Sequence, residues 1–497
     1  MVAKNLFICV DGATFNYARS VRFEENIARL TAQVTTPLRP LKSVNPSSTA
    51  PAHASAFSGK LPIEHGILGN FYNAVSVVQR NYDPVKWIHP YTYGSTLSNT
   101  ILDDLDAKGL SWAAVNMPQT VKMPVDGKSS NFTPYVLYAP EGFCILKNDH
   151  KNMVGEIKIF DRSISVLCRE NFDRIQFVTP HQTVTSTVSK EPFFIIIQDS
   201  DSFICLWVRL ETAGKEVKIW HSKAGMICGI PIDEHWRQIL ESLPPVVEKI
   251  PRFKDLDKKY TECPTEEWVT EMAIHLGRDA ELDALWVRYN TVDHAQETLL
   301  FRENELPHED AEQKIIEVYS HTLDEICRLI SAQDDIDNVV IFSDHGIDRI
   351  TQFISVPDII SEIFGPSHHV EVVYTDTRLL ALRNIKTSNM SVEDIRLSCK
   401  RLGIQLQLPM SYEERSAGWD MLLWARNNCE FSDRPQSDST LDSWAGHGGD
   451  CDRQELHGIL LTSSNVSSKG FAYAKDIREL RRVWQELLGI QSTGHES

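Results

Sequence analysis

Five short apolar runs, each followed at once by polar or small residues, constrain the fold of this chain more than any other feature. The longest has five residues, and helical stretches separate the runs, which is typical of buried parallel strands joined by helices. We therefore predict an α/β fold with polar side chains gathered at the carboxyl ends of its strands, where open α/β sheets build their sites. The runs are residues 6–10, 112–115, 285–287, 339–342 and 459–461. Residues 264–276 and 309–332 are predicted as helices that cover the sheet, from their acidic start and helical apolar spacing, respectively.

Two stretches depart from this alternation and predict insertions. Residues from about 153 to 230 contain short strand-like runs with polar breaks, and residues from about 364 to 440 separate two of the polar strand ends. At 497 residues, the chain has the length of about three compact units. We predict a catalytic core from residues 1–150, 231–363 and 441–497, a β-rich insertion over 151–230, and a smaller α+β cap insertion over 364–440.

Charge, hydropathy and cysteine content restrict the partners of the protein and its location. The 50 basic and 68 acidic residues give a net charge of -18 without a basic cluster, so duplex nucleic acid is not an expected partner. Small phosphorylated substrates stay open, since metal ions or backbone amides can supply local positive potential. The first apolar run is too short for a signal peptide, and no segment approaches the roughly 18 apolar residues of a membrane span. The ten cysteines are scattered and indicate free thiols, which is typical of a reducing compartment. We therefore expect a cytoplasmic protein without membrane association. The sequence gives no indication of its oligomeric state.

Carboxylates at the predicted strand ends indicate a two-metal site. Asp11 follows the first strand, although Asp-Gly is also a common turn. Asp293 and Glu297 share one helix face by their spacing, which a solvated acidic helix start would also explain. Asp344 and His345 are harder to explain without a ligand, because burying Asp beside His without a partner is costly.

Two further segments contribute a hydroxyl and an imidazole. Small residues after Thr49 allow a helix to begin there, so backbone amides and the helix dipole would face an anion beside this hydroxyl. Ser47, Ser48 and Thr49 fit equally well as ordinary helix N-caps. His447 lies between glycines that would let the backbone approach a metal or phosphate, or it is an incidental residue of a flexible loop.

In their order along the chain, these segments resemble the alkaline phosphatase superfamily, and within it the type I phosphodiesterase and nucleotide pyrophosphatase branch. The resemblance covers the core from the first strand to residues 487–490, and it implies a three-layer αβα alkaline-phosphatase-like core with a mainly parallel sheet. It also implies a metal-dependent phosphoric-ester hydrolase that acts on phosphodiesters or nucleotide pyrophosphates. The segments that carry it are Asp11, Thr49-Ala-Pro-Ala-His53, His65-Gly-Ile with Asn70, Asp293, Asp344-His345-Gly346 and His447-Gly448.

The roles of single residues follow from the same resemblance. One divalent ion, zinc or manganese, would be bound by Asp11, Thr49, Asp344 and His345, and a second by Asp293, Glu297 and His447. Thr49 would attack phosphorus and form a phosphothreonine intermediate. Asn70 and the amide of Ala50 would both donate to a non-bridging phosphoryl oxygen. We interpret His53 and His65 as structural.

One position departs from the family pattern. The branch has His four residues after the Asp that aligns with Asp293, whereas this chain has Glu297 there and a histidine at His294. We favour Glu297 as the ligand because the spacing is kept, and an extra carboxylate favours harder ions such as Mn²⁺ over Zn²⁺. The alternatives are that His294 turns in as the ligand, or that one metal and the activity are lost.

Competing functions follow from the same residues. A sulfatase is disfavoured, because Thr49 is neither Cys nor Ser followed by the Pro and Arg that this class requires. A phosphonoacetate hydrolase-like C–P hydrolase and a phosphomonoesterase of the same superfamily both stay open. The departure at Glu297 also leaves open a metal-binding pseudoenzyme that acts as a binding protein.

Overall fold

A seven-stranded sheet forms the centre of the protein, in the order β2–β24–β15–β1–β14–β4, with β3 beside β24. The four strands β15, β1, β14 and β4 run parallel and are buried along their whole length, as their apolar sequences predict. The mainly parallel sheet of the predicted fold class is therefore confirmed. These strands are β1 (Asn5–Val10), β4 (Trp112–Val115), β14 (Ala284–Tyr289) and β15 (Asn338–Phe342).

The structure is a computed structural model. It describes residues 4–31, 33–70, 89–121, 131–149, 152–160, 162–169, 174–187, 191–213, 216–249, 262–279, 281–301, 307–333, 336–365, 370–383, 391–407, 421–432, 444–464 and 474–490.

The prediction of a parallel strand is wrong for the fifth apolar run. This run forms β24 (Gly458–Ser464), which pairs antiparallel with β15, and β2 (Val34–Thr35) and β3 (Arg39–Leu41) pair antiparallel with β24. An apolar run indicates that a strand is buried, but it does not indicate in which direction the strand runs. Because Leu460 pairs with Phe342, β24 begins at the edge where β15 ends. The segment that precedes β24 is thereby brought to the carboxyl edge of the parallel strands.

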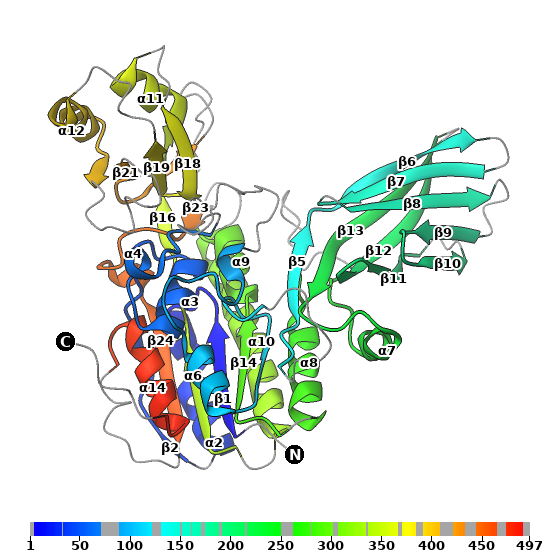
Figure 1. Ribbon diagram of the computed structural model, residues 1–497, viewed down its shortest axis with the longest axis horizontal. Coiled ribbons are helices and arrows are strands. Elements are labelled where there is room, and N and C mark those ends of the chain that lie inside the picture. Colours follow the sequence, from blue (N-terminus) through cyan, green and yellow to red (C-terminus); the bar gives the residue numbers. More distant parts are fainter. Residues whose placement is uncertain are drawn as a thin grey trace.

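Helices cover both faces of the sheet and give three layers (Figure 1). On one face, α3 and α14 pack over a core that includes Trp286 and Trp484, whose rings meet edge-on at 5.8 Å. On the other face, α8 and α10 realise the two helices predicted from the sequence. The helices of the first face are α3 (Thr49–Ser58), α6 (Ile101–Lys108) and α14 (Leu480–Leu487), and those of the second are α1 (Phe15–Ser20), α2 (Phe23–Thr31), α8 (Glu266–Asp279), α9 (Thr291–Leu299) and α10 (His308–Ser331).

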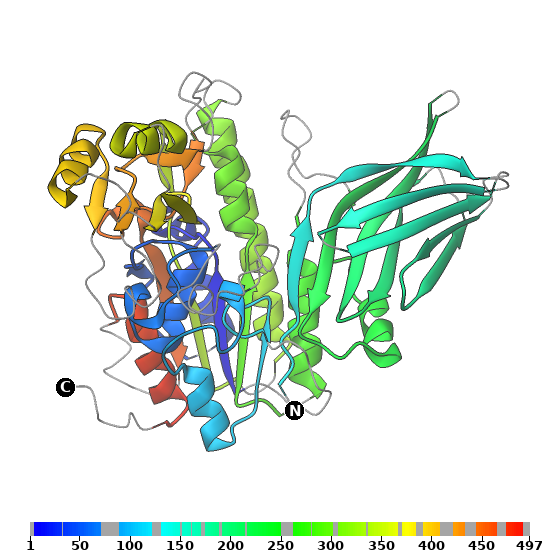
Figure 2. The same ribbon diagram turned by 45° about the horizontal axis from the view of Figure 1, so that its top comes forward.

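A second, antiparallel sheet of nine strands projects from one side of this core (Figures 1 and 2). Its order is β10–β9–β8–β7–β6–β13–β12–β11, with β5 on β13, and it encloses an apolar core of its own. The β-rich character predicted for the insertion is confirmed, and the sheet begins at Tyr135, upstream of the strand-like runs. Its strands are β5 (Tyr135–Ala139), β6 (Gly142–Asp149), β7 (Asn152–Ile159), β8 (Arg162–Arg169), β9 (Arg174–Val178), β10 (Thr183–Thr187), β11 (Phe193–Asp199), β12 (Ser202–Ala213) and β13 (Glu216–Cys228), and α7 (Glu234–Ser242) follows.

A smaller α+β unit lies above the core in Figure 1. Its sheet has the order β18–β19–β21–β20, and two helices pack with it around a separate apolar cluster. Two short strand pairs, β16–β23 and β17–β22, flank this unit in the sequence. The elements are β16 (Asp348–Ile350), β17 (Gln352–Ser355), α11 (Val356–Phe364), β18 (Glu371–Asp376), β19 (Leu379–Arg383), α12 (Val392–Arg401), β20 (Gln405–Gln407), β21 (Met421–Trp424), β22 (Cys429–Ser432) and β23 (Trp444–Gly446).

The ten cysteines are all free, as predicted. Among the described residues, no helix is both long enough and apolar enough to cross a membrane.

Candidate active site

Three parallel strands deliver their following residues to one point at the carboxyl edge of the sheet. In the register, Cys9 of β1 pairs with Arg288 of β14 on one side and with Phe342 of β15 on the other. Asp11, two residues after Cys9, therefore lies between the ends of β14 and β15. This is the carboxyl edge of the parallel strands, where open α/β sheets bind ligands.

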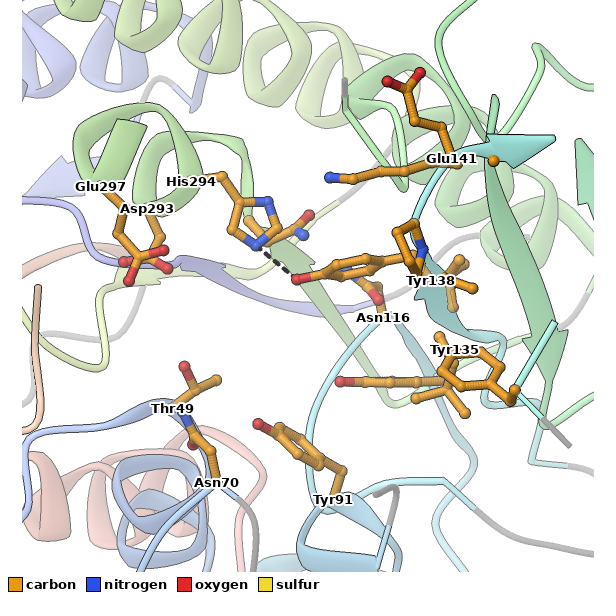
Figure 3. A pocket seen from close by; sticks show the side chains of 18 of the residues that line it. Thr49, Asn70, Tyr91, Asn116, Tyr135, Tyr138, Glu141, Asp293, His294 and Glu297 are labelled. Carbon is orange, nitrogen blue, oxygen red and sulfur yellow. Dashed lines mark hydrogen bonds between the residues drawn. The ribbon is translucent and has the colours of Figure 1, made fainter. Parts of the chain in front are cut away.

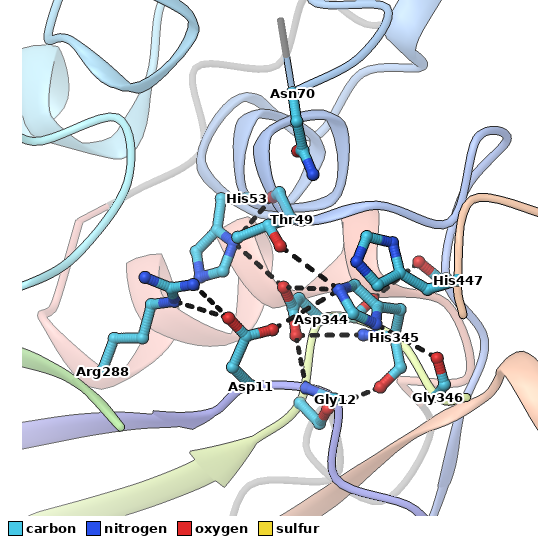
Figure 4. A network of polar contacts seen from close by, with 12 residues as sticks. Asp11, Gly12, Thr49, His53, Asn70, Arg288, Asp344, His345, Gly346 and His447 are labelled. Atoms are coloured by element: carbon cyan, nitrogen blue, oxygen red, sulfur yellow. Dashed lines mark hydrogen bonds and ion pairs between the residues drawn. The ribbon is translucent and has the colours of Figure 1, made fainter. Parts of the chain in front are cut away.

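The first group of side chains surrounds the imidazole of His345 (Figure 4). His345 Nε2 lies 3.4 Å from Asp11 Oδ1, 3.5 Å from Asp344 Oδ2 and 3.3 Å from Thr49 Oγ1. His345 Nδ1 lies 3.1 Å from the Gly346 carbonyl oxygen and donates to it, which leaves Nε2 unprotonated and directed at this group. Asp11, Asp344 and His345 can together hold a metal ion.

The second group adjoins the first through stacked imidazoles. The rings of His345 and His447 are 4.2 Å apart, and Asp293 with these two histidines forms another group whose ligand atoms converge. His447 Nε2 lies 3.5 Å from Glu297 Oε1, and the Glu297 side chain is partly exposed at the rim. All seven metal-site residues singled out from the sequence therefore lie in one continuous cluster with Thr49 at its edge.

Unsatisfied ligand atoms fit this cluster to divalent metal ions. Asp11 Oδ1, Asp293 Oδ1, Asp344 Oδ2 and His447 Nδ1 are buried without a hydrogen-bond partner in the part of the chain that the structure describes. Polar atoms buried in this way are costly unless a ligand engages them. Carboxylate oxygens and neutral imidazole nitrogens are ligands that zinc and manganese accept. The types of donor atom and their lack of hydrogen-bond partners therefore both fit a site for divalent metal ions.

The pKa values of the cluster show the same need for a cation. Burial, and then the negative charge of Asp11, raises the pKa of Asp344 well above its ordinary value. Burial and the charge of Glu297 do the same to the pKa of Asp293. Burial alone would raise the pKa of Asp11 too, but the Arg288 guanidinium outweighs it and the pKa lies below its ordinary value. Bound metal ions would lower the pKa values of Asp344 and Asp293 again and so favour the charged form of both carboxyl groups.

The structure places Thr49 as the first residue of α3 and not as its cap. Ser48 occupies the N-cap position, and its side chain makes no capping hydrogen bond. The hydroxyl of Thr49 faces His345, and the first turn of α3 supplies the positive end of a helix dipole beside it. Of the three residues considered as helix caps, Ser48 is therefore the one at the N-cap position, and Thr49 is not a cap.

Asn70 and the Ala50 amide are arranged differently from the prediction. The Ala50 N–H donates to Asn70 Oδ1 at 2.8 Å, so the two groups bond to each other and do not both point free donors at one site. The amide of Ala50 thus fixes the orientation of the Asn70 side chain. The Nδ2 group of Asn70 is left as the donor beside Thr49, and both residues line the same cavity.

Two histidines near Thr49 in the sequence are buried in the structure. His65 Nδ1 accepts from the Ile67 amide at 3.2 Å, and Nε2 lies 2.9 Å from the Ser55 hydroxyl and donates to it. His53 Nδ1 lies 2.8 Å from the Thr49 carbonyl oxygen and 3.4 Å from Asp344 Oδ2. His65, the last residue of α4 (Pro62–His65), therefore links the segment after α4 to α3, and His53 supports the backbone of Thr49.

His294 turns away from the metal cluster. Its Nε2 lies 3.1 Å from the hydroxyl of Tyr138, and the two rings meet edge-on at 5.6 Å. Of the two ligands considered for this half-site, Glu297 contacts His447 and His294 contacts the neighbouring sheet. The spacing argument that favoured Glu297 agrees with this arrangement.

A cavity of about 1030 Å³ opens between Thr49 and the nine-stranded sheet (Figure 3). Tyr91, Tyr135 and Tyr138 form much of its wall near Thr49, and Lys223 lies 4.9 Å over the ring of Tyr138. None of these residues was identified from the sequence. They come from the 3-10 helix η1 (His89–Tyr91) and from strands β5 and β13, and no local sequence motif links these elements to the residues of the core.

Arg288 is the other site residue that sequence reasoning missed. Its Nε donates to Asp11 Oδ2 at 2.9 Å, and a second guanidinium nitrogen contacts the same oxygen. The side chain is only 9% exposed and lines the cavity beside Thr49. A charged residue within a strand that is otherwise apolar and buried was the available signal.

The chain is similar to known proteins both in its sequence pattern and in its fold. The sequence profile of the type I phosphodiesterase / nucleotide pyrophosphatase family matches residues 5–398. Murine ectonucleotide pyrophosphatase / phosphodiesterase 5, in an inactive form in complex with AMP, is similar in structure with a TM-score of 0.54 and 10% identity, over 99% of this chain and 97% of that one. Phosphonoacetate hydrolase from Sinorhizobium meliloti 1021 in complex with phosphonoacetate gives 0.54 and 13%, over 98% and 96%. No curated protein sequence matches the chain.

Proposed function

The chain belongs to the type I phosphodiesterase / nucleotide pyrophosphatase family, and we propose that it hydrolyses phosphodiesters or nucleotide pyrophosphates through a phosphothreonine at Thr49. The observation that carries the proposal is the position of the Thr49 hydroxyl. It lies 3.3 Å from His345, at the edge of two adjoining carboxylate–histidine groups and in the wall of a large cavity.

The proposed cofactors are two divalent ions, zinc or manganese. Asp11, Asp344 and His345 with Thr49 would hold one ion, and Asp293, Glu297 and His447 the other. When bound, the ions would polarise the attacking and leaving oxygens and lower the pKa of the threonine hydroxyl. Glu297 in place of a neutral ligand makes the second half-site more anionic and favours manganese.

The remaining steps rest on residues of the chain itself. Thr49 attacks phosphorus in line, and the bond from phosphorus to the leaving oxygen breaks. Asn70, oriented by the Ala50 amide, donates from Nδ2 to a non-bridging oxygen. The leaving group departs into the cavity lined by Tyr91 and Tyr135. Water then attacks the phosphothreonine from the opposite side and regenerates the hydroxyl.

The proposed substrate is a small phosphorylated molecule, and the proposed location is a reducing compartment such as the cytoplasm. The cavity supports the first inference, because its volume is at the upper end for small-molecule sites. The ten free cysteines, nine of them buried, support the second.

The test is hydrolysis of bis-p-nitrophenyl phosphate, p-nitrophenyl phosphate, a nucleotide p-nitrophenyl ester and phosphonoacetate by metal-stripped protein resupplied with Zn²⁺ or Mn²⁺. We expect metal-dependent diester cleavage above monoester cleavage. Thr49→Ala should lower the rate by about 10³-fold or more and leave the protein able to bind both ions, because Asp11, Asp344 and His345 would still hold the first one. Ser48→Ala is the matched control, because this neighbouring buried hydroxyl makes no hydrogen bond, and it should retain the rate.

Three results would redirect the proposal. An active Thr49→Ala protein excludes the threonine mechanism. Cleavage of phosphonoacetate alone moves the assignment to C–P hydrolysis. A protein that binds no metal and cleaves nothing is a pseudoenzyme.

A further inference from the structure

The carboxylates of the candidate active site are crowded and poorly solvated. Asp11 and Asp344 are fully buried, Asp293 is nearly so, and Glu297 closes the rim beside His447. Four carboxylates in one cluster repel one another strongly, because a low-dielectric interior screens charge less than water does. A positive side chain beside these carboxylates therefore stabilises their charged forms.

Arg288 supplies a counter-charge in a particular way. Both of its contacts with Asp11 go to the same oxygen, Oδ2, and the other oxygen, Oδ1, accepts no hydrogen bond and faces His345. The guanidinium therefore holds the carboxylate in place and leaves one oxygen free for a cation. A buried arginine is tolerated only when it is paired in this way.

The position of Arg288 is fixed by its strand. It follows the buried Trp286 and Val287 on β14, and Cys9 of β1 pairs with it in the register. The guanidinium thus emerges at the carboxyl edge of the sheet, next to the residue that follows β1. Nothing in the loops needs to move for the contact with Asp11 to form.

We propose that Arg288 is an internal counter-ion that balances the additional carboxylate that Glu297 brings to the metal site. The inference rests on the proposed function. If two divalent ions were bound, the four carboxylates and an ionised Thr49 would leave the site with one net negative charge, and the charge of Arg288 would balance it. A neutral side chain at position 297 would make the arginine superfluous for this balance.

The inference is tested by Mn²⁺ binding to the metal-stripped full chain in a calorimeter and by thermal unfolding of the metal-free protein. Arg288→Met should bind Mn²⁺ about tenfold or more tightly, because a repelling charge is removed, and should unfold at a lower temperature without metal. Glu297→Gln should bind about tenfold more weakly. The double variant should return to within about threefold of the wild type, and Arg288→Lys, which keeps the charge, should stay close to it.

Arg162→Met is the matched control, because Arg162 pairs with the nearly buried Asp199 in the nine-stranded sheet, far along the chain from the metal site. It should lower stability and leave Mn²⁺ affinity unchanged. An Arg288→Met protein with unchanged or weaker Mn²⁺ binding overturns the counter-ion role. A wild-type protein that binds no Mn²⁺ overturns the proposed function instead, so the two failures are distinct.

Discussion

Replacing Gly12 by alanine should disturb the candidate metal site through its backbone. Gly12 follows Asp11 and has a φ of +65°, a conformation that L side chains rarely adopt. A Cβ at this position would lie 2.5 Å from Asp293 Oδ1, 2.8 Å from its Cβ and 2.9 Å from its Cα. The close approach involves the backbone of α9, so a change of rotamer at Asp293 cannot relieve it.

The expected cost has two parts that a second variant separates. The left-handed backbone costs about 1–2 kcal/mol for alanine, and forcing a methyl group into packed atoms costs about 1–3 kcal/mol more. Gly109 has a φ of +66° and nothing within 4 Å of its Cβ position. Gly109→Ala should therefore lose only the backbone part, about 1–2 kcal/mol, and Gly12→Ala should lose about 2–5 kcal/mol.

The assay is urea unfolding monitored by tryptophan fluorescence. The metal content of each variant is measured after equilibrium dialysis. We expect Gly109→Ala to bind as much metal as the wild type. Gly12→Ala should lose the ion at the half-site of Asp293, because this carboxylate is displaced. Equal stability losses in the two variants, with full metal content in both, would show that the contact between Gly12 and Asp293 does not constrain the site.

Two further predictions concern single side chains. Glu297→His should move the preference of the second half-site from Mn²⁺ toward Zn²⁺, measured as the ratio of the two dissociation constants; an unchanged ratio means that Glu297 is not a ligand. Burial lowers the pKa of His65 to about 3, so its neutral form contributes stability that is complete above the unfolded pKa of about 6.5 and is lost as the pH falls toward 3. The stability advantage of the wild type over His65→Gln should therefore shrink by about 2 kcal/mol between pH 7 and pH 5 in urea unfolding, and parallel pH profiles would contradict this.

Local patterns in the sequence predict much of the core. The runs at residues 6–10 and 339–342 are apolar enough to be buried strands wherever they lie, and the polar residues after them must then meet at a sheet edge. The β-rich stretch could be recognised from its short alternating runs. The order of Asp11, Thr49, Asp293, Asp344 and His447 along the chain was enough to predict a two-metal site.

Other features depend on which strands become neighbours. Burial gave no direction for β24, which runs antiparallel and so starts at the edge of the site, and the segment that leads into it carries His447. The bond between the Ala50 amide and Asn70 depends on how the loop after α3 returns to its first turn. Neither contact can be predicted from residue type or spacing. Each joins residues that come close only because of the path that the chain takes in the folded protein.

Residue types and their spacing predicted the buried core strands, the helices α8 and α10 and the candidate metal ligands, because burial and ligand chemistry are properties of short segments. Only the tertiary structure decided that Arg288 grips Asp11 and that tyrosines of the nine-stranded sheet face Thr49. These residues come from elements far apart in the sequence, and strand register and sheet packing bring them together. Contacts between distant elements thus set the charge and the shape of the candidate active site. Its candidate ligand atoms belong to short segments that can be recognised one by one in the sequence.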